Sequence, residues 1–134
     1  MRLFIGGFSQ GKLSYVLQKC EKPFVVIDGD ETESLHAMEI QENSLVWNHF
    51  HLFVRSKLYQ HEDWESEDII REANGVCESY LQCSIICDEV GNGIVPIDAF
   101  ERKYREMVGR VCCILAQQAE SVERIHCGLG IKLK

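Results

Sequence analysis

The sequence is short of the residues that mark several large classes of protein. It has only two prolines, and its 14 Lys and Arg are outnumbered by 21 Asp and Glu, which gives a formal net charge of −7 over 134 residues. A chain this acidic lacks the positive charge that releases counterions from a phosphate backbone, which argues against nucleic-acid binding. No apolar run approaches the ~20 residues that span a bilayer, and no signal-peptide pattern opens the sequence, so we expect a cytoplasmic protein without membrane partners.

The cysteines also lack the patterns of disulfide-stapled and zinc-binding proteins. There are seven of them, an odd number, and no C-x-x-C pair occurs. Disulfide frameworks use even numbers of cysteines, and structural zinc sites use closely spaced pairs. We therefore predict reduced thiols.

What is present suits one α/β domain over residues 1–134. A hydrophobic fraction of 46% is enough to build a core. Apolar runs typical of buried strands occupy residues 2–5, 24–27, 45–47, 84–87 and, as a strand or hairpin, 125–133. Helical spacing occurs at residues 14–20, 50–58, 62–82 and 99–119, and a loop with one helical turn is predicted for 31–43. The alternation predicts a mostly parallel central sheet with helices on both faces.

The sharpest motif follows the first predicted strand. Gly6 to Lys12 fits G-x-x-x-x-G-K, the pattern of a phosphate-binding loop. Its glycines let backbone N–H groups converge on a phosphate, the following helix adds positive potential, and Lys12 supplies charge for the outer phosphates. The candidate nucleotide-binding residues are Gly6, Gly7, Phe8, Ser9, Gln10, Gly11, Lys12, Leu13 and Ser14. Lys12 is the candidate catalytic residue if the protein is an enzyme.

The end of this motif departs from the pattern. A Ser or Thr hydroxyl normally binds Mg²⁺ at the position of Leu13, and the Leu13 side chain has no oxygen. Ser14 comes next, but one residue along a helix turns the side chain by about 100°. The alternative is a glycine-rich turn between a strand and a helix that contains a lysine by chance.

Two acids and two histidines are further candidates. Asp28 and Asp88 each follow a predicted strand, where a carboxylate could hold the metal of a nucleotide, although most such acids are solvated strand ends. His49 and His51 would share a face on a strand and could bind a metal there, whereas on a helix they diverge by about 200°. The sequence fixes no third ligand, so surface or core histidines remain the alternative.

The second half of the sequence resembles a known family. Asp88 to Pro96 reads Asp-Glu-Val-Gly-Asn-Gly-Ile-Val-Pro. With Arg102-Lys-Tyr-Arg105 and the terminus Gly128 to Lys134, it is similar to the bifunctional adenosylcobinamide kinase / adenosylcobinamide-phosphate guanylyltransferase family. The resemblance covers residues 1–28 and about 83–134. The matched positions outside the phosphate loop are Glu89, Gly91, Gly93, Pro96, Arg102 and Arg105.

This resemblance implies a P-loop NTPase-like fold, a homotrimer and a role in cobalamin biosynthesis. It implies ATP or GTP with Mg²⁺ as cofactors and a corrinoid as substrate, whose side-chain hydroxyl is phosphorylated. It further implies transfer of GMP through a histidine that lies after the second strand.

The departures from the family pattern are substantial. The segment around residues 29–44 is shortened, and His36, its one histidine, lacks the family's Arg-Pro and Trp context, so we do not assign it the nucleophile role. Leu13 stands where the family has the hydroxyl that binds the metal ion, and Asn48 stands where it has the carboxylate on the metal. We therefore predict a shortened family member in which guanylyl transfer is lost and kinase activity is in question. The alternative is a catalytically inactive homologue that acts as a nucleotide-binding regulator or structural partner.

Overall fold

A six-stranded sheet runs through the computed structural model, which describes residues 1–32 and 43–134. The strand order is β2-β3-β4-β1-β5-β6, and only β6 is antiparallel to its neighbour. The described strands are β1 (Arg2–Gly6), β2 (Phe24–Asp28), β3 (Ser44–Asn48), β4 (Gln82–Asp88), β5 (Ser121–His126) and β6 (Leu129–Lys132). The helices are α1 (Lys12–Lys19), α2 (Phe50–Gln60), α3 (Ser66–Cys77) and α4 (Ala99–Gln118). The predicted α/β class with a mostly parallel sheet is confirmed.

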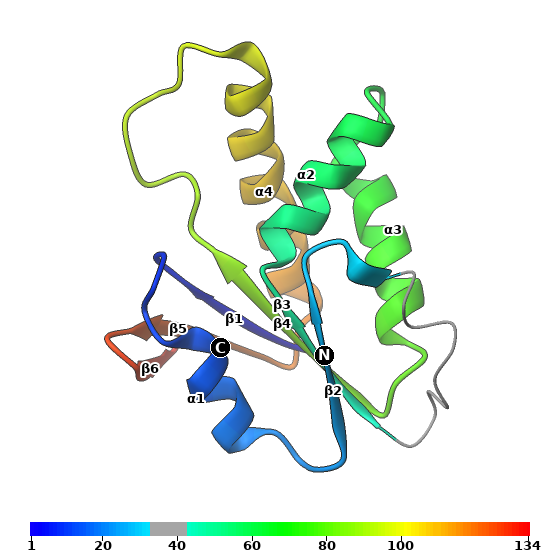
Figure 1. Ribbon diagram of the computed structural model, residues 1–134, viewed down its shortest axis with the longest axis vertical. Helices are drawn as coiled ribbons and strands as arrows, with labels where there is room; N and C mark the ends of the chain where they lie inside the picture. The colour runs from blue at the N-terminus through cyan, green and yellow to red at the C-terminus, as the bar shows by residue number, and fades with distance from the viewer. Residues whose placement is uncertain (33–42) are drawn as a thin grey trace.

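Helices cover both faces of the sheet, but unequally. Helix α1 packs on one face, while α2, α3 and α4 pack on the other (Figure 1). The period of two along each strand divides the core, so Phe4, Val46 and Ile86 lie in the cluster beneath α1. Their chain neighbours Leu3 and Trp47 lie in the larger cluster beneath the other three helices. Both clusters are buried, which explains why the central strands are apolar on both faces.

The predicted helix over residues 62–82 is shorter than its pattern suggested. Helix α3 ends at Cys77, and β4 begins at Gln82. The short turn between them brings Cys77 and Cys83 together in a disulfide, with their Cα atoms 5.3 Å apart. The expectation that all thiols are reduced is wrong for this pair, because the spacing of six residues matches no recognised motif and only the turn brings the two side chains together.

The end of the described chain is a hairpin rather than a single strand. Strands β5 and β6 pair antiparallel around Cys127 and Gly128, and both of these residues have a positive φ, of 49° and 75° respectively. Most of the predicted loop over residues 31–43 lies outside the described residues, and so do His36 and most of the shortened segment around 29–44.

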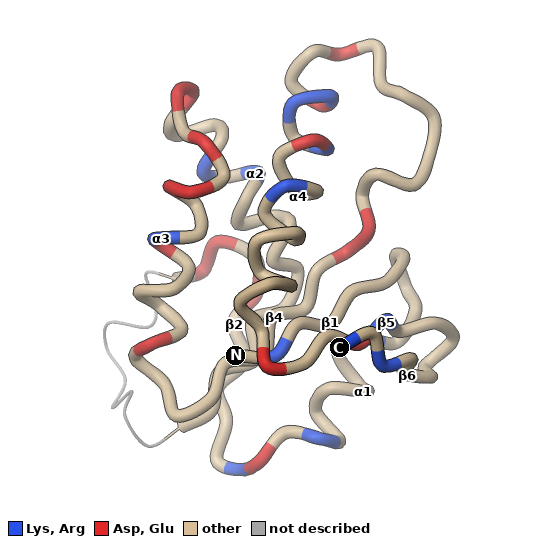
Figure 2. Tube along the Cα trace, turned by 180° about the vertical axis from the view of Figure 1, so that it is seen from behind, with Lys and Arg blue, Asp and Glu red and all other residues tan. Residues whose placement is uncertain are grey.

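Charges of both signs are interleaved on the helices. Figure 2 shows Lys and Arg alternating with Asp and Glu along α4, where Arg110 forms an ion pair with Glu106 at 2.5 Å. Among the described helices, none is long and apolar enough to cross a bilayer.

Candidate nucleotide-binding site

The carboxyl ends of the five parallel strands lie on one side of the sheet. In the ladders, Gly6 of β1 lies opposite Asp88 of β4, and Asp28 of β2 lies opposite Asn48 of β3. Ligands of open parallel sheets bind on this side, because the loops that follow the strands converge there. The predicted phosphate loop follows β1 and therefore lies on this side.

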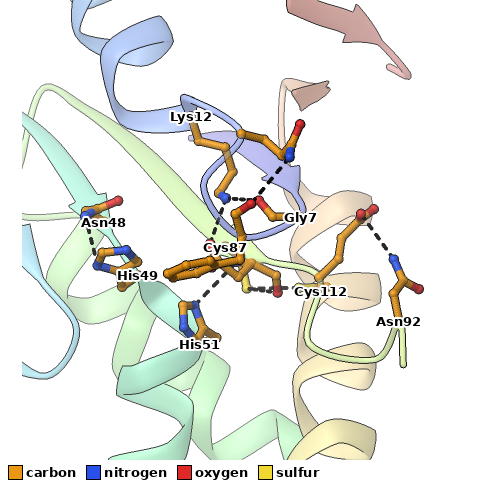
Figure 3. Close-up of polar contacts among 12 residues, drawn as sticks. Gly7, Lys12, Asn48, His49, His51, Cys87, Asn92 and Cys112 are labelled. Atoms are coloured by element: carbon orange, nitrogen blue, oxygen red, sulfur yellow. Dashed lines mark hydrogen bonds and ion pairs between the residues drawn. The ribbon is translucent and has the colours of Figure 1, made fainter. Parts of the chain in front are cut away.

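Lys12 is buried at the centre of this site. Its Nζ donates a hydrogen bond to the backbone oxygen of Gly7 at 2.7 Å and forms an ion pair with Asp88 Oδ1 at 2.8 Å (Figure 3). The two charged side chains are only 6% and 7% exposed. The loop lysine is thus held by its own loop and by the strand beside it.

The loop requires glycine at two positions for different reasons. Gly11, the residue before α1, has a φ of 78°, a conformation in which a side chain would be strained. Gly6 requires glycine for space, since a Cβ there would lie 2.3 Å from the backbone oxygen of Ile125 in β5. These two glycines let the chain turn from the buried strand directly into the helix, whose first N–H groups have no partner within the helix.

Gln10 ties the phosphate loop to the β5–β6 hairpin. Its side-chain oxygen accepts a hydrogen bond from the backbone N–H of Cys127 at 2.8 Å, and its backbone oxygen accepts one from Gly128 at 2.9 Å. The sequence analysis named Gln10 only as a loop residue and missed this role. No local signal reveals it, because the partners lie 117 and 118 positions away.

A pocket of about 320 Å³ lies between the phosphate loop and the ends of β3 and β4. The walls are formed by loop residues 8–14, Asn48, His49 and Asp88. The pocket is of the size that small ligands occupy. Leu13 also packs against the core cluster beneath α1, so its side chain contributes to packing and offers no oxygen to a ligand.

Asp28 is held by residues of the neighbouring strand rather than by Lys12. Its Oδ1 lies 2.6 Å from His49 Nδ1, and its Oδ2 accepts a hydrogen bond from Asn48 Nδ2 at 3.3 Å. Of the two acids proposed from the sequence, the structure therefore brings Asp88 to the loop lysine and Asp28 to His49. Sequence reasoning missed this carboxylate–imidazole pair, since the register of β2 against β3 is what creates it.

The two histidines lie at the start of α2 rather than on a strand. Their rings meet edge to face with centroids 5.6 Å apart. The buried His51 ring lies next to β4, where its Nδ1 is 3.4 Å from the backbone N–H of Asp88. Burial lowers the pKa of His51, against the opposing effect of the Asp88 carboxylate. Within residues 1–32 and 43–134, no group of three or more His, Cys, Asp or Glu side chains is placed to hold a metal ion.

The loop that follows β4 is fastened by arginines of α4. Arg105 donates hydrogen bonds to the backbone oxygens of Ile94 at 2.5 Å and Gly93 at 3.1 Å, and also to that of Gly91. Arg102 does the same for Pro96, at 3.0 Å. The spacing R-x-x-R puts both guanidinium groups on neighbouring turns of one face of α4, which explains why both arginines bind backbone oxygens of this loop.

Glu89 connects the same loop to the hairpin. Its carboxylate forms an ion pair with Arg124 of β5 at 3.0 Å and accepts a hydrogen bond from Asn92 at 3.3 Å. Its backbone N–H donates to the oxygen of Gly6 at 3.0 Å. Glu89 thus contacts the end of β1, the loop after β4 and strand β5 of the hairpin.

Comparison with known proteins identifies the family. The family model described as cobinamide kinase / cobinamide phosphate guanyltransferase matches residues 17–133. This match covers most of the chain, including the loop with Glu89 and the arginines of α4, but it begins after the phosphate loop.

Two curated relatives agree with this match. Both are named bifunctional adenosylcobalamin biosynthesis protein CobU. The one from Salmonella typhimurium is 40% identical over 50 residues, which are 37% of this chain and 28% of the relative. The one from Escherichia coli is 30% identical over 81 residues, which are 54% of this chain and 45% of the relative. The matched stretches span less than half the length of either relative. From the family model, the chain belongs to the cobinamide kinase / cobinamide phosphate guanyltransferase family, whose fold is P-loop NTPase-like.

Proposed function

We propose that this protein binds ATP or GTP in the pocket above β1 and transfers the γ-phosphoryl group to the hydroxyl of adenosylcobinamide, without the guanylyl transfer of the family. The observation that carries the proposal is the buried pair of Lys12 and Asp88 at 2.8 Å, directly beneath the phosphate loop. A lysine in this position serves the outer phosphates of a nucleotide. The N-terminus of α1 adds positive potential to the pocket, and Lys12 contributes its charge to the phosphates once it leaves Asp88.

Nucleotide binding requires Lys12 to change partners. Its Nζ contacts the Gly7 oxygen and the Asp88 carboxylate. A triphosphate offers more negative charge than one carboxylate, so Nζ turns toward the phosphates, and the loop amides replace water around them. The Asp88 carboxylate then loses one of its cationic contacts.

Asp88, once it has lost its contact with Lys12, is a candidate ligand for a Mg²⁺ ion bound with the nucleotide. Magnesium ions in nucleotide sites are held by one or two carboxylates together with phosphate oxygens and water. Both oxygens of Asp28 already contact neighbouring side chains, so we retain only Asp88 as a candidate ligand. When bound, the ion would neutralise charge on the transferring phosphoryl group.

The loss of guanylyl transfer follows from the shortened segment. The family's nucleotide-accepting histidine belongs to a sequence context that residues 29–44 do not contain. The corrinoid and the family's trimer are carried into this proposal from the resemblance, as the substrate and the assembly in which it acts.

Titration calorimetry with ATP and GTP, with and without Mg²⁺, tests the proposal on the wild type and on Lys12→Ala. We expect micromolar binding by the wild type and its loss in the variant. The matched control is Lys57→Ala, which removes a lysine of α2 whose ion-pair partner is Glu72, and it should bind as the wild type does. Absence of binding by the wild type would refute the proposal, and equal binding by Lys12→Ala would show that the loop does not hold the phosphates.

The residues Leu13 and Asn48 favour a second function. Leu13 and Asn48 stand where a hydroxyl and a carboxylate serve the metal, and losing both costs transition-state stabilisation but leaves the loop amides and Lys12 in place. A catalytically inactive homologue that binds nucleotide as a regulator or structural partner would show calorimetric binding without phosphorylated cobinamide. A kinase assay on adenosylcobinamide separates the two functions.

A further inference from the structure

The contact between Asp28 and His49 has the geometry of a catalytic dyad. Asp28 Oδ1 and His49 Nδ1 are 2.6 Å apart, so a proton must lie between them, because two lone pairs would repel at that distance. An ionised carboxylate only accepts hydrogen bonds, which places the proton on Nδ1. Asn48 Nδ2 lies 3.0 Å from the same nitrogen, and its own hydrogen is directed to Asp28 Oδ2. Asp28 and Asn48 together thus set the tautomer and the orientation of the His49 ring.

The tautomer leaves the other ring nitrogen, Nε2, with a free lone pair. Among the described residues, no hydrogen bond or ion pair engages Nε2. His49 lines the same pocket as Lys12 and Asp88 and is 38% exposed. A nitrogen that is fixed in direction and accessible to a bound ligand can accept a proton from it.

The backbone of His49 is held in an uncommon conformation. Its φ of 47° and ψ of 44° lie in the left-handed region, at the junction of β3 and α2. Non-glycine residues rarely adopt this conformation, and such strain concentrates at functional sites. Here it places the His49 ring against Asp28 of β2, while His51 two residues later remains buried beside β4.

Charged and titratable groups from four elements face His49. Asp28 contacts it from β2, Lys12 of α1 and Asp88 of β4 line the same pocket, and His51 lies edge to face with it from α2. His51 adds no positive charge, since burial lowers its pKa. Lys12 and Asp88 pair with each other at 2.8 Å.

We propose that His49 is the general base of the phosphoryl transfer and that Asp28 is its positioning residue. This inference rests on the proposed function and names the group that activates the acceptor. His49 Nε2 takes the proton of the acceptor hydroxyl while that oxygen bonds to the γ-phosphorus. The bond from the γ-phosphorus to the β–γ bridging oxygen breaks, and its electron pair leaves with the nucleoside diphosphate. The Nδ1 proton stays shared with Asp28, whose negative charge stabilises the imidazolium.

The variants are chosen for the left-handed backbone at this position. His49→Asn keeps a residue that tolerates a positive φ and removes the base, and His49→Gly opens a space that added imidazole can enter. His61→Asn is the matched control, since His61 lies outside the pocket and stacks on Trp64 with ring centroids 4.1 Å apart. Asp28→Asn tests the positioning residue.

Phosphorylation of adenosylcobinamide and calorimetric nucleotide affinity are measured on each variant. We expect His49→Asn to lower kcat on the order of 100-fold with nucleotide affinity unchanged, and imidazole to restore part of the turnover of His49→Gly. Asp28→Asn should lower kcat less and shift its pH profile. In ¹⁵N spectra, His49 of the wild type should carry its proton on Nδ1, and Asp28→Asn should change this tautomer.

The outcomes separate this inference from the function on which it rests. No nucleotide binding by the wild type refutes the proposed function. Nucleotide binding with no transfer to the hydroxyl by the wild type refutes the phosphoryl transfer of the proposed function, and the inference with it. Equal turnover in His49→Asn and His61→Asn, with transfer by the wild type, overturns only the inference about His49. An Nε2-protonated His49 in the spectra also overturns it.

Discussion

Lys12 and Asp88 form a buried ion pair at 2.8 Å between the first turn of α1 and the end of β4. The pairing joins the phosphate loop to the strand beside it, which is separated from the loop by most of the chain. A buried pair of this kind contributes little net stability compared with apolar residues, but removing one partner leaves a buried charge. Removing one charge of the pair should therefore lower the stability more than removing both.

Asp88→Asn should therefore destabilise the protein by about 3 kcal/mol, measured by urea denaturation in the absence of nucleotide. The double variant Lys12→Met with Asp88→Asn removes both charges, and it should recover most of that loss. If the single and double variants were equally unstable, the loss would come from packing around Asp88 rather than from an unpaired lysine.

Leu13→Ser tests what the missing hydroxyl does. The variant gives up apolar burial and supplies an oxygen at the metal-side position, so we expect nucleotide affinity in Mg²⁺ to rise about tenfold, equivalent to ~1.4 kcal/mol. Leu13→Ala is the matched control, because it loses similar packing and gains no oxygen. Calorimetry with and without Mg²⁺ measures the difference. Equal affinities for the Ser and Ala variants would mean that the loop places this side chain away from the ion.

Gly6→Ala should disrupt the junction of β1 and β5. The added Cβ would lie 2.3 Å from the Ile125 backbone oxygen, so the two strands must separate, at a cost of about 3 kcal/mol. Gly7→Ala is the control, since its Cβ meets only the Gln10 side chain at 3.6 Å, an ordinary contact. Denaturation midpoints at equal m-values compare them, and a tolerated Gly6→Ala would contradict the close approach of the strands.

Stability should fall as the pH drops from 7 to 5.5 because of His51. Burial lowers the pKa of His51 in the folded state, while an unfolded imidazole titrates near ~6.5. Below that pH the unfolded chain binds the additional proton, so the free energy of unfolding decreases by up to ~1.4 kcal/mol per pH unit, and the contribution is complete above it. His51→Gln should flatten this slope, and His61→Gln should leave it unchanged. Parallel slopes for the wild type and His51→Gln would assign the effect to another group.

Arg105→Ala should loosen the loop over residues 91–94. The guanidinium group holds three backbone oxygens of that loop, and hydrogen bonds from a charged donor contribute ~1.5 kcal/mol or more each when well ordered. Limited proteolysis should cut the variant faster within the loop than it cuts Arg110→Ala, whose arginine is paired with Glu106 on the exposed side of α4. The same cleavage rate in both variants would show that the loop is held by other contacts.

The fold could be predicted because its signals are local. The apolar runs of β1, β2 and β3, and the helical stripe of α4, each appear within a few residues of sequence. The glycines of the phosphate loop, together with Lys12, also form a local pattern, since a strand–loop–helix unit is continuous in the chain. The boundary of α3 could not be predicted, because the helical spacing of apolar residues continues through Tyr80 and Leu81, and residues 78–81 before β4 contain no glycine or proline.

The partners within the site could not be predicted, because each depends on strand order and register. Both Asp28 and Asp88 follow apolar strands in the same way in the sequence. The sheet places β4 beside β1 and β2 beside β3, so one acid reaches Lys12 and the other reaches His49. The sequence by itself determined the α/β class, the glycine pattern of the predicted phosphate loop and the absence of a hydroxyl at Leu13. Only the tertiary structure decided that Asp88 contacts Lys12 and Asp28 contacts His49, because each contact is made across neighbouring strands by residues far apart in the chain.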